Sequence, residues 1–219
     1  MRHLTAIILG MALAALSLGA VLAAETVELV SEWNPSGALP DGCSPALTGG
    51  GQPPKWVNVE AANGEARGVS EVSRDDTDYR FPLCIVDDPA FANLANLDTS
   101  IRFRAVAGKV DRAAGIAIRV KDARNYYVVR ANALEDDVRL YVVLDGERRE
   151  FAGKSTKVAA DQWHTLRLRA VGDRFTVSFD DAPLFEATDR RLSGPGRIAL
   201  WSKADSVSEF FDFKVEPLP

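Results

Sequence analysis

The sequence has 219 residues, of which 47% are hydrophobic and 26% are charged, so one domain with a full core is expected. Its formal net charge is -5, and the basic residues are scattered among acidic ones. This charge pattern argues against nucleic acid and against an anionic membrane surface as partners.

The first residues have the pattern of an export signal. Arg2 and His3 precede an apolar run from Leu4 to about Ala23, and small residues flank the end of that run. We predict a signal peptide at residues 1–23 and a single domain at 24–219, periplasmic or secreted and not inserted in a membrane after cleavage. The alternative is an uncleaved anchor, since the run approaches the ~20 residues that span a bilayer.

The sequence contains two cysteines, Cys43 and Cys84. In an oxidising compartment the simplest arrangement is one disulfide, closing a loop of about 40 residues and contributing roughly 3–4 kcal/mol in the chain-entropy model. Two buried free thiols are the alternative. A metal site built on them is disfavoured because no histidine or further cysteine is near.

Turn residues and short β-branched runs alternate through the first half of the chain. A Gly/Pro/Ser-rich stretch at 35–54 predicts a loop. Short strands are predicted at 56–59, 68–72 and 79–83, and Pro82 marks the last of them as an edge or a bulge. One helical turn or a short helix is predicted within 89–97.

The second half of the chain is more regular. Apolar and polar residues alternate, and turn signals separate the runs. The predicted strands are 99–105, 115–120, 125–130, 138–144, 163–170, 174–180, 183–185, 197–201 and 209–215. Gly172-Asp173 predicts a hairpin between two of them. This spacing predicts two packed antiparallel sheets.

Three segments carry a family resemblance: Trp163-His164-Thr165-Leu166-Arg167-Leu168, Gly196-Arg197-Ile198-Ala199-Leu200-Trp201 and Phe210-Phe211-Asp212-Phe213-Lys214-Val215. The chain resembles the concanavalin A-like (laminin-G-like) jelly rolls, most closely the bacterial 3-keto-disaccharide hydrolase domains. The resemblance covers roughly Ile101 to Val215. It implies an all-β, two-sheet antiparallel jelly-roll sandwich that binds glycans or acts on 3-keto-glycosides.

Alternation along 115–144 predicts a ligand-binding face. If Ile116, Ile118, Val120, Tyr127, Val129, Leu140, Val142 and Leu144 point inward, the opposite face carries Arg119, Tyr126, Val128, Arg130, Arg139 and Tyr141. Arg104 joins this face if its strand is adjacent. Aromatic rings stack on sugars and guanidinium groups donate to hydroxyls, so this face is the predicted glycan groove of a concave sheet. By the same parity Trp201 and Lys203 lie at the groove or at the opposite rim. The alternative is a solvent-facing sheet whose long side chains cover apolar surface.

Catalytic signals are sparse. The three strands of this segment contain no carboxylate pair of the kind that retaining glycosidases use, and Glu135-Asp136-Asp137 is typical of a turn. His164, the only histidine after cleavage, is expected to be structural. A hydrolase or lyase for 3-keto-glycosides would need its base and electrophile from Lys203, Asp212 or His164, so catalysis stays open.

The expected partner is a carbohydrate or glycoconjugate, and the expected state is a monomer. No cofactor is expected. The acid pairs Asp75-Asp76, Asp87-Asp88 and Asp180-Asp181 are alternative Ca²⁺ ligands, although solvated turns explain them more simply. A non-catalytic protein-interaction module of the envelope is the remaining alternative function.

Overall fold

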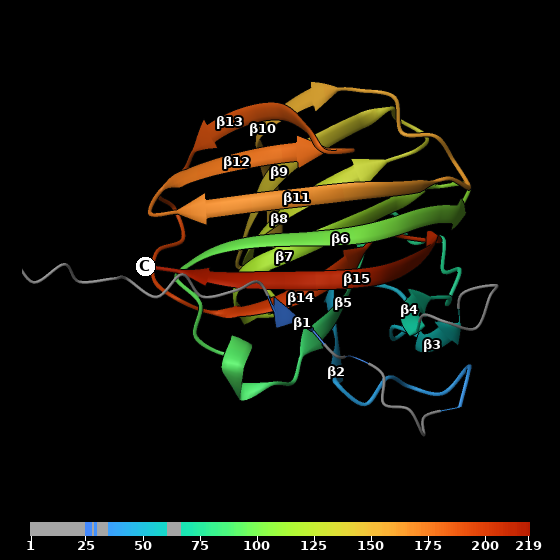
Figure 1. Ribbon diagram of the computed structural model, residues 1–219. Helices are drawn as coiled ribbons and strands as arrows, with labels where there is room; N and C mark the ends of the chain where they lie inside the picture. Colours follow the sequence, from blue (N-terminus) through green and yellow to red (C-terminus); the bar gives the residue numbers. More distant parts are fainter. Residues whose placement is uncertain (1–24, 28, 30–34, 61–66) are drawn as a thin grey trace, which may run out of the picture.

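The computed structural model describes residues 25–27, 29, 35–60 and 67–219 (Figure 1). The predicted signal peptide lies outside these residues. Within them the chain forms fifteen strands and a single-turn 3-10 helix, η1 (Pro89–Phe91), where one helical turn or a short helix is predicted. None of the helices in this part of the chain could span a bilayer. The predicted all-β sandwich of two antiparallel sheets is confirmed.

The front sheet in Figure 1, here called sheet A, contains eight strands. Its order is β13 (Ala182–Thr188), β12 (Arg174–Phe179), β11 (Trp163–Val171), β6 (Asn96–Ala107), β15 (Val207–Leu218), β4 (Arg67–Glu71) and β3 (Trp56–Glu60), and β1 (Glu25–Thr26) pairs with β15. The predicted hairpin at Gly172-Asp173 joins β11 and β12.

The second sheet, sheet B, lies behind sheet A and contains seven strands. Its order is β10 (Glu147–Ser155), β9 (Asp137–Leu144), β8 (Asn125–Asn132), β7 (Ala113–Asp122), β14 (Arg197–Ser202), β5 (Arg80–Val86) and β2 (Cys43–Gly49). The predicted strands 115–120, 125–130 and 138–144 are thus β7, β8 and β9, which pair consecutively and antiparallel and are here called the ribbon.

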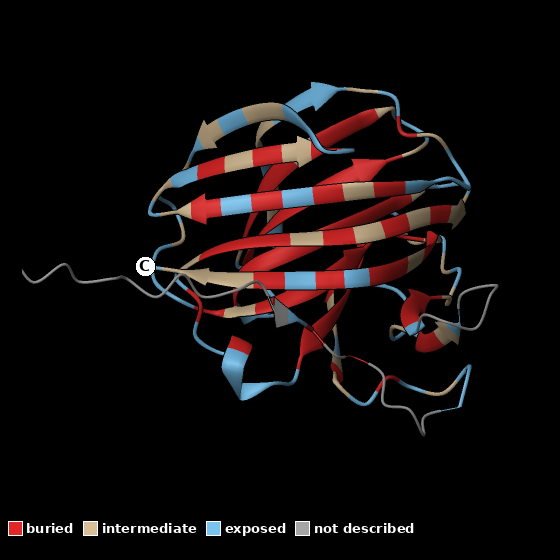
Figure 2. Cartoon of the chain, viewed as in Figure 1, coloured by how far each residue is buried: buried red, intermediate tan, exposed pale blue. Residues whose placement is uncertain are grey.

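The two sheets differ in how their outer faces are covered (Figure 2). On β11, buried and exposed residues alternate, as expected for a strand with one face on the core. On β5, β7 and β8 nearly every residue is buried. The main core lies between the sheets and includes Ile101 and Leu166 from sheet A and Ile116 and Val129 from sheet B.

A second apolar cluster covers the face of sheet B that points away from the core; we call it the outer layer. All of its buried members come from sheet B strands. They are Phe81, Leu83, Ile85, Ala113, Ala117, Val120, Tyr126, Val128, Tyr141, Val143, Ala199 and Trp201. Both faces of sheet B are therefore largely apolar, and the buried charged residues on its strands are Arg80, Arg119, Arg130 and Asp137.

Contacts across sheet B show that it bends, with the outer layer on the concave side. In a flat sheet β10 and β5 would stand about 24 Å apart, five strand spacings. The guanidinium carbon of Arg148 on β10 nevertheless lies 4.5 Å from the ring centroid of Phe81 on β5. Similarly, the hydroxyls of Thr48 on β2 and Tyr126 on β8 are 2.9 Å apart.

Three details of sheet B differ from the predictions. β2 lies within the stretch predicted as a loop, and as the edge strand it tolerates Pro45. β10, at the other edge, is mostly exposed and charged, so it lacks the alternation of a buried strand. β5 is not an edge strand: β14 pairs with it only from Leu83 to Ile85, so Pro82 lies beyond that ladder.

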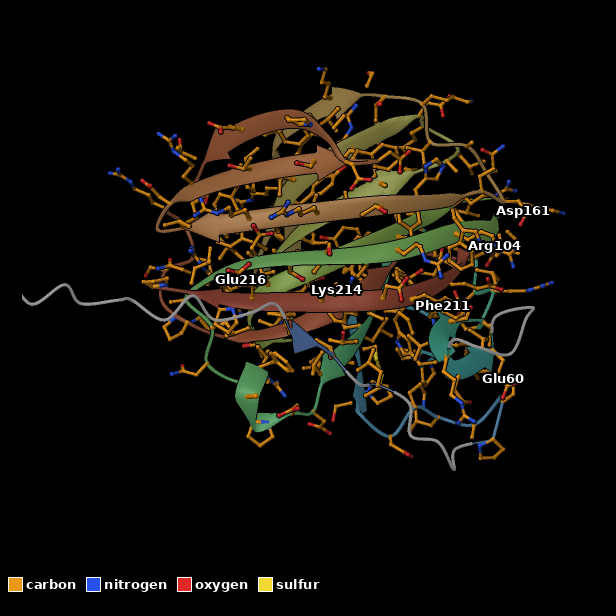
Figure 3. The ribbon with its side chains drawn as sticks, in the orientation of Figure 1. Glu60, Arg104, Asp161, Phe211, Lys214 and Glu216 are labelled. Atoms are coloured by element: carbon orange, nitrogen blue, oxygen red, sulfur yellow. A yellow bond between two sulfur atoms is a disulfide. The ribbon has the colours of Figure 1, made fainter. Side chains whose placement is uncertain are left out.

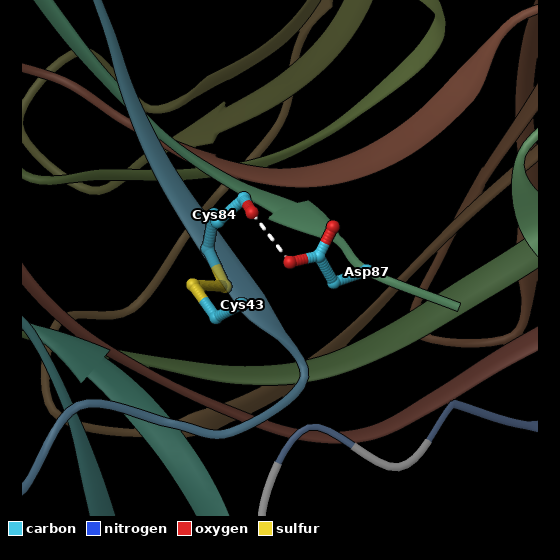
Figure 4. The surroundings of a disulfide bond; sticks show 4 residues. Cys43, Cys84 and Asp87 are labelled. Atoms are coloured by element: carbon cyan, nitrogen blue, oxygen red, sulfur yellow. Dashed lines mark hydrogen bonds between the residues drawn. A yellow bond between two sulfur atoms is a disulfide. The ribbon is translucent and has the colours of Figure 1, made fainter. Parts of the chain in front are cut away.

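The predicted disulfide between Cys43 and Cys84 is confirmed (Figure 4). It joins the neighbouring strands β2 and β5 and is fully formed, with no free cysteine among the described residues. The edge strand of sheet B is therefore covalently held to the interior of the sheet.

A buried ion pair connects the two sheets near the ends of β4 and β5. Arg80 Nη2 lies 3.3 Å from Glu71 Oε1, and both side chains are fully buried. Arg80 also donates to the carbonyl oxygens of Gln52 and Ala204, at 3.0 and 2.9 Å. Glu71 accepts a bond from the backbone N–H of Lys55. This network fixes two loops relative to both sheets.

Removing one member of this pair leaves the other charge buried without a partner. We expect Glu71→Ala to lower the free energy of unfolding by about 3–5 kcal/mol. Glu147→Ala is the matched control because it breaks an exposed pair with Arg149, for which a change within about 1 kcal/mol is expected. Urea denaturation measures both variants, and equal losses would contradict the role given to the buried pair.

Candidate functional site

Four of the six predicted binding residues lie on the concave face of sheet B. Tyr126 and Tyr141 belong to the outer layer, and Arg130 bonds to the Tyr141 hydroxyl at 3.1 Å. Arg139 stands opposite Arg130 in the β8–β9 ladder. Tyr126 is fully buried and Arg130 is 1% exposed, so both support the face from beneath.

The prediction that Arg119 lies on this face is wrong. The register of β7 shifts between Ile118 and Asp122, and Arg119 takes a positive φ of 50°. A bulge of this kind turns the following side chains to the other face, so Val120 enters the outer layer and not the core. The Arg119 guanidinium instead lies over the core rings of Tyr127 and Phe175, at 5.9 and 5.6 Å.

Arg104 also lies elsewhere, because its strand is not adjacent to the ribbon. β6 is in sheet A, between β11 and β15. Arg104 lies on sheet A (Figure 3). On the outer face of that sheet it bonds to Glu209 at 2.8 Å, and its guanidinium lies over the ring of Trp163. The condition set for Arg104 is therefore not met. The predicted binding residues divide among three places: Arg104 on the outer face of sheet A, Arg119 over the core rings, and Tyr126, Arg130, Arg139 and Tyr141 on the concave face of sheet B.

A lysine between two carboxylates forms the first polar element of the concave face. Lys203 follows β14, and its ammonium lies 2.6 Å from Asp111 and 2.8 Å from Asp78. Asp111 is 1% exposed and also accepts a bond from the Asn132 amide at 3.0 Å. Asp78 is exposed, so the group formed by Asp111, Lys203 and Asp78 extends from the buried floor to the surface.

The electrostatics of this group decide what Lys203 can do. Burial disfavours its charge, but bonds and charges from Asp111 and Asp78 outweigh burial and raise the pKa of the ammonium. Burial raises the pKa of Asp111, with Lys203 acting in the opposite direction. Lys203 therefore remains charged and serves as a hydrogen-bond donor, not as a base.

Arg130 forms the second polar element. Its Nη2 donates to Glu135 at 2.8 Å and to Asp137 at 2.9 Å, in addition to Tyr141. Burial opposes the charge, but Tyr141, Glu135 and Asp137 together raise the pKa of the guanidinium. The side chain of Glu135 is 49% exposed, which leaves its carboxylate accessible beside a fixed positive charge.

Arg148 forms the third element and is the residue that sequence reasoning missed. Its guanidinium carbon lies 4.4, 4.5 and 5.8 Å from the ring centroids of Tyr141, Phe81 and Trp201. Its Nη1 is buried and has no hydrogen-bonding partner among the described residues. The signal that could have found it is Asp145-Gly146, a tight-turn dipeptide that predicts a partner strand immediately after it.

Two residues at the end of the segment 72–79, Asp78 and Tyr79, join these elements. Tyr79 donates from its hydroxyl to the Gly146 carbonyl at 2.9 Å and accepts from the Arg148 backbone N–H at 2.8 Å. Tyr79 is 46% exposed, and its ring packs edge-on against Phe81. Together with Asp78, Tyr79 presents an exposed aromatic and an exposed acid beside Arg148.

The other residues considered for catalysis lie away from this face. His164 is 8% exposed, stacks on Phe179 and bonds to Asp180 at 2.7 Å, consistent with the predicted structural role. Asp212 pairs with Arg102 on the outer face of sheet A. Only Lys203, with Trp201, reaches the concave face of sheet B.

In this structure, each acid pair considered as a Ca²⁺ ligand has a carboxylate that accepts hydrogen bonds from backbone N–H groups. Asp75 accepts from two backbone N–H groups, Asp88 caps η1 and Asp180 accepts from Thr165. Among the described residues, no three His, Cys, Asp or Glu side chains gather in a way that could hold a metal ion.

Solved structures share the topology described above. CBM66, a carbohydrate-binding module from Bacillus subtilis, superposes with a TM-score of 0.62 at 20% identity, over 80% of this chain and 97% of that one. A protein of unknown function with a galectin-like fold, also from Bacillus subtilis, gives 0.58 at 13% identity over 91% and 96%. The fold is a concanavalin A-like, galectin-like jelly roll.

A third jelly roll, the exoplasmic/lumenal domain of VIP36 in a form bound to Ca²⁺ and Man3GlcNAc, gives a TM-score of 0.51 at 14% identity, over 80% of this chain and 83% of that one. No protein-family model matches the sequence, and no curated protein matches it. At these identities the jelly-roll likeness defines the fold alone.

The acidity of Asp75 makes the segment at 72–79 sensitive to pH. Bonds from the Thr77 side chain and from the backbone N–H groups of Gln52 and Thr77 lower its pKa from 3.8 to about 2. Because folding lowers this pKa, the carboxylate stabilises the segment above pH 3.8, and that stabilisation is lost as the pH falls towards about 2.

We expect the amide resonances of Gln52 and Thr77 to shift in NMR spectra as the pH falls from about 4 to about 2, the range set by that pKa. In Asp75→Asn they should be displaced at neutral pH and insensitive to acid. Asp76→Asn, which changes an exposed neighbour, should titrate like the parent protein. Acid shifts that persist in Asp75→Asn would contradict the assignment.

Proposed function

We propose that this jelly roll binds carbohydrate on the concave face of sheet B, and that Arg148 is the centre of the binding surface. The observation that carries the proposal is the Arg148 guanidinium held over three aromatic rings with Nη1 unpartnered among the described residues. A buried donor without an acceptor is unfavourable, and a ligand hydroxyl or carboxylate would supply that acceptor.

The groups around Arg148 match the chemistry of a sugar. Carbohydrate hydroxyls both donate and accept, and this surface offers the carboxylates of Glu135 and Asp78 as acceptors and Lys203 as a donor. The exposed ring of Tyr79 provides an apolar surface on which a pyranose can stack. Acids and bases are present together, so a neutral or weakly charged glycan suits the surface better than a polyanion.

The fold is consistent with this proposal. CBM66 is a carbohydrate-binding module, and VIP36 has been solved with a mannose-containing glycan. Jelly rolls of this kind offer a broad curved sheet for ligands, and the concave face of sheet B carries the buried ion pairs of Arg130 and Lys203. The proposal therefore concerns the ligand class, a glycan, and the face that binds it.

Arg148 and its neighbour Arg149 provide a matched test. We expect Arg148→Met to weaken glycan binding at least about tenfold, since hydrogen bonds to a charged group contribute about 1.5–3 kcal/mol. Arg149→Met should bind normally, because Arg149 is exposed and pairs with Glu147. A glycan array identifies the ligand, and calorimetry then measures both variants.

Equal affinity of the two variants would contradict the assignment of Arg148. Failure of the parent protein to bind any glycan on the array would instead favour the protein-interaction alternative.

We infer that the chain acts outside the cytoplasm. The disulfide between Cys43 and Cys84 requires an oxidising compartment to form and persist, and the predicted signal peptide would deliver the chain there.

Hydrolysis or elimination of a 3-keto-glycoside is a second candidate function, favoured by the buried Lys203–Asp111 pair. A ketone makes the adjacent C–H acidic, and a fixed ammonium could stabilise the enolate oxygen when a carboxylate removes that proton. Glu135 is the accessible carboxylate for this step.

We expect any such activity to fall at least about 100-fold in Lys203→Met, as for loss of one donor to a developing oxyanion. Asp136→Asn, in the same turn as Glu135 but paired with Lys157, is the control. Chromatographic detection of the released sugar from a 3-keto-disaccharide measures the rate. Equal rates with and without the protein would exclude this reaction.

A further inference from the structure

A cavity of about 380 Å³ lies at one end of the sandwich, away from the Arg148 surface. It is lined by the loop before β6, the β11–β12 turn and the segment after β13, with Ala95, Arg119, Gly172, Asp189 and Leu192 among the lining residues. The volume is large enough for a monosaccharide or another organic molecule of similar size.

Arg119 is the distinctive residue of this cavity. It is 5% exposed, yet no carboxylate lies within ion-pair distance of it among the described residues. Its Nε and Nη2 donate to the carbonyl oxygens of Ala95 and Gly172, at 3.1 and 2.5 Å. Among the residues that the structure describes, no acceptor is found for Nη1. A buried cation without a counter-ion is unfavourable unless a ligand supplies one.

The surrounding charges favour an anion. Asp173 and Asp189 line the cavity, but Arg190 pairs with Asp173 at 2.5 Å and Arg191 pairs with Asp189 at 2.5 Å. The Tyr127 hydroxyl also donates to Asp189 at 2.6 Å. Both carboxylates are thus neutralised within the chain, whereas Arg119 is not.

The backbone is specifically shaped to place Arg119 here. The residue holds a positive φ, which is strained for a side chain of this size. Gly196 on the neighbouring segment makes the close approach possible, since a Cβ there would lie 2.5 Å from the Arg119 carbonyl carbon. Two unusual backbone positions together turn a charged residue away from the sheet face and into the cavity.

We propose that this cavity is a second ligand site, independent of the Arg148 surface, for an organic monocarboxylate of about the size of a sugar acid. The ligand carboxylate pairs with the Nη1 side of Arg119. The carbon skeleton of the ligand lies against Ala95 and Leu192.

Calorimetry with glucuronate, its methyl ester and sodium sulfate tests the proposal on the purified protein. Glucuronate should bind at least tenfold more tightly than the ester, which has the same shape without the charge, and more tightly than sulfate. Arg119→Met should lose at least tenfold in affinity. Ser193→Trp, which fills the cavity from an exposed position and keeps Arg119, should lose as much.

Two controls separate this site from the rest of the protein. Arg174→Met changes an exposed arginine on β12 that pairs with Glu186, and it should bind glucuronate normally. Arg148→Met should also bind it normally, so failure of the proposed glycan surface and failure of this site are distinguishable. Equal binding of acid and ester, equal binding of sulfate, binding that survives both cavity variants, or no binding of glucuronate would each overturn the proposal.

Discussion

The buried ion pair between Arg80 and Glu71 holds together the parts of the molecule that form the concave surface. It links β5 of sheet B to β4 of sheet A, and Arg80 additionally holds the backbone of Ala204, next to Lys203. The segment at 72–79, which carries Asp78 and Tyr79, runs directly between the two partners. Both ends of that segment are therefore fixed by one interaction whose disruption would leave a charge inside the protein.

Sheet B combines this anchoring with an unusual distribution of apolar residues. Both of its faces are largely apolar, and the sheet curves so far that Arg148 at one edge reaches Phe81 near the other. The curvature places polar groups from strand ends and loops, which are distant in the chain, around one small area. Glu135, Lys203 and Arg148 each have their geometry fixed by buried partners, which is the preorganisation that specific recognition requires.

Alternation along a strand predicted part of this arrangement correctly. It placed Arg130, Arg139 and Tyr141 on one face of the ribbon, and it left Trp201 and Lys203 at either the groove or the opposite rim. It failed at Arg119, because one extra residue lies between Ala117 and Val120 in the ladder with β14, and such a bulge reverses the parity of the next side chains. The same effect turns Phe211 outward to meet Trp163, since the register of β15 shifts between Phe211 and Lys214. Arg148 escaped notice because its strand is exposed and charged, and so carries no alternation.

The sequence by itself determined most of the strand pattern, with β2 and β10 as exceptions, together with the pairing of Cys43 with Cys84 and the two-sheet jelly roll. These features depend on local periodicity, turn residues and the number of available thiols. Only the tertiary structure decided which sheet holds Arg104, where Arg119 points and how Arg148 comes to lie over Phe81. Those outcomes depend on strand order, bulges and sheet curvature. Each is set by contacts between residues far apart in the chain, and no short-range pattern encodes them.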